Sequence, residues 1–202
     1  MALLKVKCNY EGILTAANII ENEGVVIFPT DTVYGMGCNP YSKNAVKKIY
    51  NIKARDTTKL LPILLYSRNI AMEIAQFDKY SYTLAEKFWP GPLTLVLKLK
   101  DKRLTESLNL KDKVAIRIPN NKCTLELLKR CKLITGTSAN VSGQKPFTDP
   151  ISCYQNISGF DVFLDGGEIS GGVPSTIVEI IDGEINIQRE GSITKEEIMK
   201  VF

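Results

Sequence analysis

The sequence contains no histidine, and this absence excludes several common kinds of active site. A Ser-His-Asp triad, a Cys-His pair and a zinc ion held by histidine all need an imidazole. Any catalysis by this chain must therefore rest on carboxylates, hydroxyls, Lys, Arg, backbone donors or a hard metal ion.

Cysteine is also scarce, because only five residues are spread along the 202-residue chain and no two stand in a C-x-x-C arrangement. They are Cys8, Cys38, Cys123, Cys131 and Cys153. An odd number at wide spacing is not typical of a disulfide framework or of a zinc site. We therefore expect free buried thiols.

Long apolar runs are missing as well. No run approaches the roughly 20 residues of a membrane-spanning helix, and the apolar stretch at the N-terminus is too short for a signal peptide. We expect a cytoplasmic protein with no membrane partner. The net charge of +4 is too small by itself to indicate nucleic acid binding.

The order of apolar patterns predicts a mixed α/β fold. Short apolar runs typical of strands alternate with segments of helical periodicity, several of them begun by a capping residue such as Ser42 or Thr194. Asp182-Gly183 stands between two alternating runs and predicts a hairpin. We expect one domain over residues 1–202, with an open, twisted, mixed sheet and flanking helices.

Small polar residues gather where predicted strands end, which is where α/β proteins build binding sites. The segment PTDTVYG covers residues 29–35 and GTSANVSG covers residues 136–143. Their hydroxyls and glycines suit a polar ligand, although either segment could be an ordinary turn. Asp31 is expected to be a turn residue. Neither segment matches a Walker A loop or a dinucleotide fingerprint.

Basic residues are concentrated between Lys43 and Lys59, where six of them accompany a single acid. Lys53, Arg55 and Lys59 suit a triphosphate, although a solvated loop is an equal alternative. The lysines of segment 43–48 are either a solvated helix face or a nucleic acid contact.

Arg117 interrupts an apolar predicted strand. A buried arginine needs a partner, so we expect a carboxylate or phosphate beside it, from the protein or from a ligand.

Together these segments resemble the YrdC-type family of L-threonylcarbamoyladenylate synthases, in its short, single-domain form. The segments that carry the resemblance are residues 24–37, 49–59, 89–97, 114–119, 137–143, 174–180 and 188–193. No one of them is decisive, but seven in the same order along nearly the whole chain are specific.

The resemblance implies an open α/β sheet around a basic, concave cavity. It implies that the protein condenses L-threonine, bicarbonate or CO2 and ATP into threonylcarbamoyl-AMP and pyrophosphate, with Mg²⁺ accompanying ATP. A threonylcarbamoyl-transfer enzyme complex would then modify the adenosine next to the tRNA anticodon.

The resemblance also implies roles for individual residues. Threonine would be bound by Thr32, Arg117, Ser138 and Ser175. The residues expected to bind ATP are Lys53, Arg55, Lys59, Asn140, Thr148 and Arg189. No general base or metal ligand stands out. Many relatives have a histidine where this chain has Leu64, so the contact from that wall is lost or replaced.

Two other functions compete with this one. The basic stretch could belong to a module that binds double-stranded RNA or tRNA without synthase activity. Aromatic residues there are sparse, with only Tyr41 and Tyr50, so base stacking is not favoured. The family also resembles the carbamoyl-adenylate-forming domain of hydrogenase-maturation proteins, but the acylphosphatase and zinc-finger regions of those proteins have no counterpart in this sequence.

Overall fold

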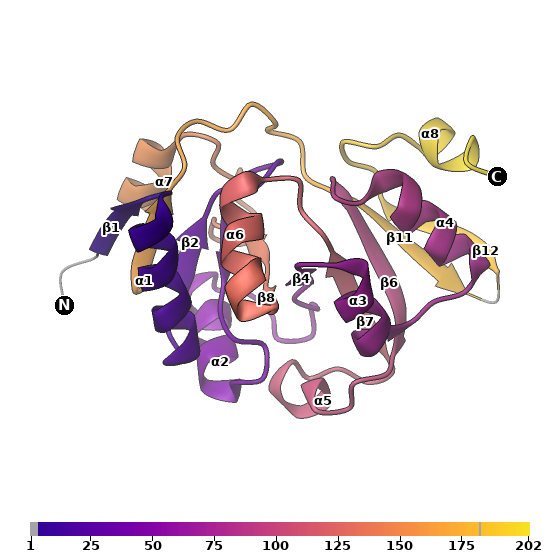
Figure 1. Cartoon of the computed structure of the whole chain (residues 1–202), viewed down its shortest axis with the longest axis horizontal. Helices are drawn as coiled ribbons and strands as arrows, with labels where there is room; N and C mark the ends of the chain where they lie inside the picture. Colours follow the sequence, from indigo (N-terminus) through magenta and orange to yellow (C-terminus); the bar gives the residue numbers. More distant parts are fainter. Residues whose placement is uncertain (1–3, 182) are drawn as a thin grey trace.

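The computed structural model describes residues 4–181 and 183–202, which form two mixed β-sheets covered by helices (Figure 1). The first sheet has the order β1 (Leu4–Lys7), β10 (Val162–Asp165), β2 (Val26–Phe28), β3 (Gly35–Gly37) and β9 (Thr137–Ser138). The second has the order β12 (Glu184–Arg189), β11 (Thr176–Ile181), β6 (Leu93–Leu99), β7 (Lys113–Arg117), β4 (Ile63–Leu65) and β8 (Leu133–Thr135), with β5 (Ala75–Gln76) beside β6.

All but the last of the helices in the described chain connect these strands. The helices are α1 (Tyr10–Glu21), α2 (Lys43–Ile52), α3 (Arg68–Ile74), α4 (Lys79–Phe88), α5 (Leu104–Ser107), α6 (Lys122–Cys131), α7 (Pro150–Asn156) and α8 (Lys195–Met199). The predicted caps are confirmed, since the side chains of Ser42 and Thr194 accept hydrogen bonds from the third residue of their helices.

Parallel and antiparallel pairs occur in both sheets. In the first, β10 runs parallel to β1 and β2, while β3 is antiparallel to β2 and β9. In the second, β6 is parallel to β11 and antiparallel to β7. The mixed α/β class is therefore confirmed, but the strands divide between two sheets where the sequence suggested one.

The predicted hairpin is present, because β11 and β12 pair in antiparallel register on either side of the turn. Of the two turn residues, Asp182 lies outside the described residues, and Gly183 has the positive φ of 84° that this turn requires.

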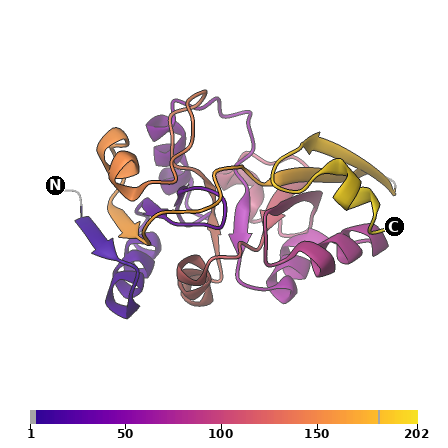
Figure 2. The same ribbon diagram turned by 90° about the horizontal axis from the view of Figure 1, so that it is seen from above.

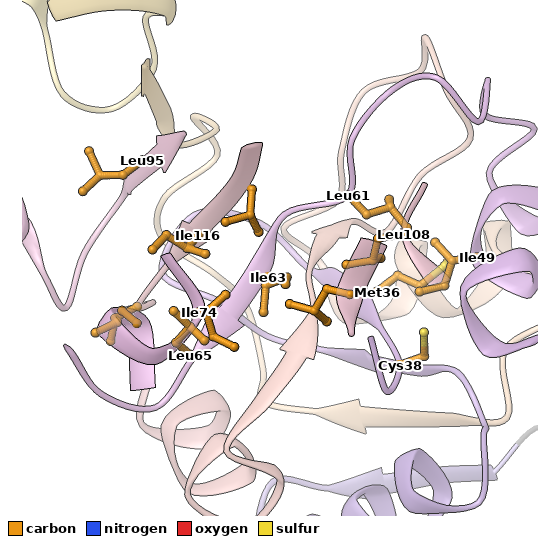
Figure 3. Packing of buried hydrophobic residues seen from close by; sticks show 14 of the residues in the cluster. Met36, Cys38, Ile49, Leu61, Ile63, Leu65, Ile74, Leu95, Leu108 and Ile116 are labelled. Atoms are coloured by element: carbon orange, nitrogen blue, oxygen red, sulfur yellow. The ribbon is translucent and has the colours of Figure 1, made fainter. Parts of the chain in front are cut away.

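Successive side chains of β2 point to opposite faces of the first sheet, and each face is covered by different helices. Val26 and Phe28 of β2 belong to a cluster with α1 and α6, whereas Ile27 belongs to the cluster that includes α2. Seen from above, α1 and α6 lie on one side of this sheet and α2 on the other (Figure 2). The larger core continues into the second sheet through Ile63 and Ile116 (Figure 3).

Two segments that the sequence suggested were loops contain short strands. Gly35–Gly37 is β3, which is fully buried, and Thr137–Ser138 is β9. A Cβ on Gly37 would collide with the carbonyl oxygen of Thr135, so the close approach of the two sheets requires glycine there. The sheets are joined at this point because the amide of Thr135 donates to the carbonyl oxygen of Cys38 at 2.9 Å.

The expectation that all cysteines are free thiols is wrong for one pair. Cys8 and Cys123, which are 115 positions apart, form a disulfide between the β1–α1 connection and α6. The fold brings them together, and their spacing gives no sign of it. Cys38, Cys131 and Cys153 are free, and burial raises the pKa of the Cys38 thiol to about 12.

Among the described residues, no helix is both long enough and apolar enough to cross a bilayer.

The core allows a prediction about stability. Ile63 is fully buried on β4, between β7 and β8. We expect Ile63→Ala to lower the free energy of unfolding by about 2–5 kcal/mol, because it removes buried methyl groups and leaves a cavity. Ile151 is 59% exposed on α7, so Ile151→Ala should stay within about 0.5 kcal/mol of wild type. Urea unfolding midpoints compare the two variants, and equal midpoints would contradict the packing described above.

Candidate functional site

A cavity of about 490 Å³ lies where loops of the first sheet face the second sheet. The second sheet forms the floor of this cavity, and the side chains that reach it are set by their alternation along the strands. On β6 and β7, Leu95 and Ile116 point into the core, so Thr94, Val96 and Arg117 point to the opposite face and line the cavity. The polar residues that interrupt these apolar strands are therefore those directed at the cavity.

The segment between β2 and β3 forms one wall. The Thr30 hydroxyl donates to the carbonyl oxygen of Val33 at 2.7 Å and accepts from the amides of Thr32 and Val33. This turn brings the Thr30 and Thr32 hydroxyl oxygens within 3.0 Å of each other. The ordinary turn that the sequence allows for this segment is thus present, and it holds Thr32 against the cavity.

Arg117 lies beside this turn with only 6% of its surface exposed. Its Nε donates to the carbonyl oxygen of Gly91 at 3.0 Å, and its Nη1 donates to the Thr32 hydroxyl at 3.3 Å. Its Nη2 pairs with Oδ1 of Asp31 at 2.5 Å. Burial lowers the pKa of the guanidinium, and the Asp31 carboxylate opposes that shift. Arg117 therefore has the expected carboxylate partner within the protein, and Asp31 does more than shape a turn.

A third group of polar atoms surrounds Ser175 at the start of β11. Arg189 donates through Nη2 to the carbonyl oxygen of Ser175 at 2.7 Å and to its hydroxyl at 3.2 Å. The hydroxyl of Thr94 lies 2.9 Å from that of Ser175. Sequence reasoning missed Thr94, although it shares with Arg117 the signal of a polar residue within an apolar strand.

The cavity also collects cations. Arg55 and Arg189 both line it, and burial lowers the pKa of both guanidinium groups. The charge of Arg55 lowers the pKa of Arg189 further, and Arg189 acts on Arg117 in the same way. Three arginines thus repel one another around the cavity, with Asp31 as the nearby acid, and an anionic ligand would relieve this repulsion.

Asn140 and Ser138 complete the predicted set that meets in this cavity. Asn140 is held by hydrogen bonds from its Nδ2 to the carbonyl oxygens of Val141 and Gln144. The expected residues that line the cavity are Thr32, Arg55, Arg117, Ser138, Asn140, Ser175 and Arg189.

Lys53, in contrast, is buried behind the cavity wall with 1% of its surface exposed. Its Nζ donates to the carbonyl oxygens of Ser138 and Asn140, the latter at 2.7 Å, and lies 3.4 Å from Oδ1 of Asn140. Burial, reinforced by the charge of Arg55, lowers the pKa of this lysine to about 8. The side chain holds the 138–140 segment in place.

Two other expected ATP ligands are also outside the cavity lining. Lys59 is exposed, and its carbonyl oxygen accepts a hydrogen bond from the Tyr50 hydroxyl. Thr148 accepts a backbone hydrogen bond from Ile169 at 3.0 Å. Their assignment to ATP remains a prediction from resemblance.

The lysines of α2 face solvent, and two of them have protein partners. Lys43 pairs with Glu106 at 2.9 Å, and Lys48 donates to the carbonyl oxygen of Glu23 at 3.1 Å. These contacts favour a solvated helix face over a dedicated nucleic acid site.

Leu64, the position for which the resemblance implies a histidine in many relatives, lines the cavity. A Cβ on Gly136 would collide with its side chain, so the glycine leaves room for Leu64. That wall is apolar here, and it offers contact without a hydrogen bond.

Comparison with known proteins places this geometry in a family. The family model Sua5_yciO_yrdC, described as Telomere recombination, matches residues 18–191. A threonylcarbamoyl-AMP synthase of Pyrococcus abyssi is 35% identical over 193 residues, which are 93% of this chain and 56% of that protein. A threonylcarbamoyl-AMP synthase of Bacillus subtilis is 35% identical over 196 residues, 94% of this chain and 56% of that protein.

A solved structure agrees. The crystal structure of Pyrococcus abyssi Sua5 complexed with L-threonine has a TM-score of 0.89 and 34% identity, and the match covers 100% of this chain and 61% of that one. The present chain thus spans a little over half the length of these relatives. The match of the family model over most of the chain shows that this chain belongs to the Sua5/YciO/YrdC family.

Proposed function

We propose that this chain is an L-threonylcarbamoyladenylate synthase, which forms threonylcarbamoyl-AMP and pyrophosphate from L-threonine, bicarbonate or CO2 and ATP. The observation that carries the proposal is the convergence of seven expected substrate residues on one cavity. The names of the relatives support it, as does the relative crystallised with L-threonine.

In this proposal each substrate has a separate place in the cavity. The threonine carboxylate would bind Arg117, with the hydroxyls of Thr32, Ser138 and Ser175 around the rest of the amino acid. The phosphates of ATP would lie toward Arg55 and Arg189, since arginine forks match phosphate oxygens. This division gives each arginine that lines the cavity an anionic ligand.

The chemistry joins two anions, so electrostatics and positioning are its main requirements. The threonine amine attacks CO2 and loses a proton, or attacks bicarbonate with loss of water, and becomes N-carboxylated. The new carboxylate then attacks the α-phosphorus of ATP, and pyrophosphate leaves. The threonine α-carboxylate takes no part in bond formation, so Arg117 can hold it through both steps.

Magnesium would enter as part of the Mg–ATP substrate. The described residues contain no cluster of three or more Asp, Glu, Cys or His groups able to hold a metal ion. A magnesium ion bound by the protein alone therefore does not fit this donor set, and the arginines are the cations that the protein itself supplies.

The product is an activated mixed anhydride that a second enzyme must consume. We propose a threonylcarbamoyl-transfer complex acting on tRNA as that partner, and the cytoplasm as the place of reaction. The tRNA need not touch this chain.

The direct test is an assay with ATP, bicarbonate and labelled L-threonine. We expect pyrophosphate release that depends on threonine, and a labelled threonylcarbamoyl-adenylate product. Omission of bicarbonate, with CO2 removed, should abolish both signals. ATP turnover without a threonine requirement would contradict the proposal, and salt-sensitive RNA binding alone would favour the RNA-binding alternative.

Two substitutions should separate the substrates. Arg117→Ala should reduce kcat/KM for threonine by about 100-fold or more, because a charge-paired contact in a buried site is lost. Arg55→Ala should instead raise the KM for ATP and leave the KM for threonine nearly unchanged. Each variant serves as the control for the other, and melting temperatures confirm folding. Equal effects on both substrates would refute the assignment of separate subsites.

Lys53→Met tests the role of the buried ammonium. Methionine fits the space but removes the Lys53 donor from both carbonyl oxygens, and that of Ser138 keeps the amide of Asn140 at 3.0 Å. The loss at Asn140 should destabilise the fold by about 1–3 kcal/mol. The KM should rise for both substrates, because the 138–140 segment carries a residue of each subsite. Lys47→Met, at an exposed position on α2, is the matched control. A stable Lys53→Met protein that had lost only ATP binding would make Lys53 a direct ligand instead.

A further inference from the structure

Arg117 has hydrogen-bonding capacity left over after its contacts with the described residues. A guanidinium has five N–H donors. Three of them are directed at the Gly91 carbonyl oxygen, the Thr32 hydroxyl and the Asp31 carboxylate. One N–H on Nη1 and one on Nη2 remain, which is enough for a ligand carboxylate. Arg117 therefore already holds one carboxylate, that of Asp31, and can accept a second.

Asp31 differs from the aspartates that serve as turn or cap residues in this chain. Asp149 accepts from the amide of Ser152 at 2.6 Å, and Asp165 accepts from the amide of Gly167 at 2.9 Å. Among the described residues, the side chain of Asp31 has Arg117 as its one hydrogen-bond partner. Its Oδ2 is buried and accepts no hydrogen bond there.

A buried carboxylate oxygen without a donor is costly. The turn also does not depend on it, because the Thr30 hydroxyl makes the bonds that close the turn. The contact that accounts for Asp31 is its charge against Arg117.

We propose that Asp31 is a positioning residue that acts through Arg117 as an internal counter-ion, holding the guanidinium at the cavity and weakening its hold on the substrate carboxylate. The inference rests on the proposed function, because it takes the threonine α-carboxylate as the ligand of Arg117. With threonine bound, the one positive charge of Arg117 faces two carboxylates, and these repel each other beside a buried guanidinium.

The weakening applies to substrate and product alike. Both carry the same α-carboxylate, since the reaction modifies the amine. Tighter binding of both would hold the product back and give no gain in the chemical step. A built-in competing anion therefore favours release.

The test compares wild type with Asp31→Asn, which keeps the shape and an oxygen acceptor but removes the charge. Calorimetry should show L-threonine binding about tenfold more tightly to the variant, because carboxylate repulsion is gone. The affinity for ATP should be unchanged. L-Threoninamide, which has no carboxylate, should bind equally to both proteins. In turnover, the KM for threonine should fall while kcat does not rise.

Asp101→Asn is the matched control. Asp101 pairs with Arg103 at 2.7 Å, and neither residue lines the cavity. The control loses the same charge from an Asp–Arg pair, so its threonine affinity should equal that of wild type. Asp31→Glu, which retains the charge, should bind threonine as weakly as wild type does.

Stability provides a second readout. Asp31→Asn leaves a buried arginine without a counter-charge, so the melting temperature should fall by roughly 5 °C or more. The double variant Asp31→Asn/Arg117→Gln lacks both charges. It should melt at a higher temperature than either Asp31→Asn or Arg117→Gln alone. If Asp31→Asn does not fold, Asp31→Glu and this double variant decide the matter. An Asp31→Glu protein with altered threonine affinity, or a double variant that melts no higher than Arg117→Gln alone, would refute the counter-ion role.

Unchanged or weaker threonine binding by a folded Asp31→Asn protein overturns the inference. If wild type binds no threonine at all, the proposed function fails instead. The counter-ion role is then decided with acetate as the probe, which should raise the melting temperature of Asp31→Asn more than that of wild type at equal ionic strength.

Discussion

The contact between the two sheets is the constraint on which the site depends. Where β3 ends and β8 ends, Cys38 and Thr135 exchange hydrogen bonds, with the Thr135 hydroxyl accepting from the amide of Cys38 at 2.9 Å. The chain leaves β8 there and enters the segment of Ser138 and Asn140. The segment of Thr32 lies just before β3. One junction thus holds two polar walls at a fixed distance from the floor that β6 and β7 provide.

Charge is the second determinant of the site. The cavity combines cations from a loop, a central strand and an edge strand, namely Arg55, Arg117 and Arg189. Each of them satisfies some donors on backbone carbonyl oxygens, which are neutral and so leave the positive charge in place. Fixed backbone acceptors orient the guanidinium groups without neutralising them, and of the three Arg117 also pairs with a carboxylate, that of Asp31. Preorganised positive charge of this kind is what a reaction between two anions requires.

Much of this arrangement could be predicted from the sequence, because the signals depend on residues that are neighbours along the chain. Ser42 and Thr194 cap helices because capping depends on three or four neighbouring residues. Arg117 stood out because charge within an apolar strand is costly, and that cost requires a partner wherever the chain finds one.

The remainder depends on tertiary contacts. Gly35–Gly37 was not recognised as a strand because, besides nearby β2, it pairs with β9, which comes about 100 residues later. The same holds for Lys53, whose basic neighbours suggested a phosphate ligand. Its burial follows from packing against a segment about 85 residues away. Thr94 was missed because a single hydroxyl in a strand is a weaker signal than a charge.

The disulfide gives the chain a covalent topology with its own consequence. Cys8 and Cys123 close a ring that contains Thr32, Arg55 and Arg117, while Ser138, Ser175 and Arg189 lie on the tail beyond it. In chain-entropy terms a ring of this size disfavours the unfolded state by about 4–5 kcal/mol. Next to Cys123, the Thr124 hydroxyl donates to the carbonyl oxygen of Pro29, where the cavity wall that contains Thr30 and Thr32 begins. The thiol redox state of the surroundings therefore determines whether the part of the site that holds Arg117 belongs to a closed ring or to an open chain.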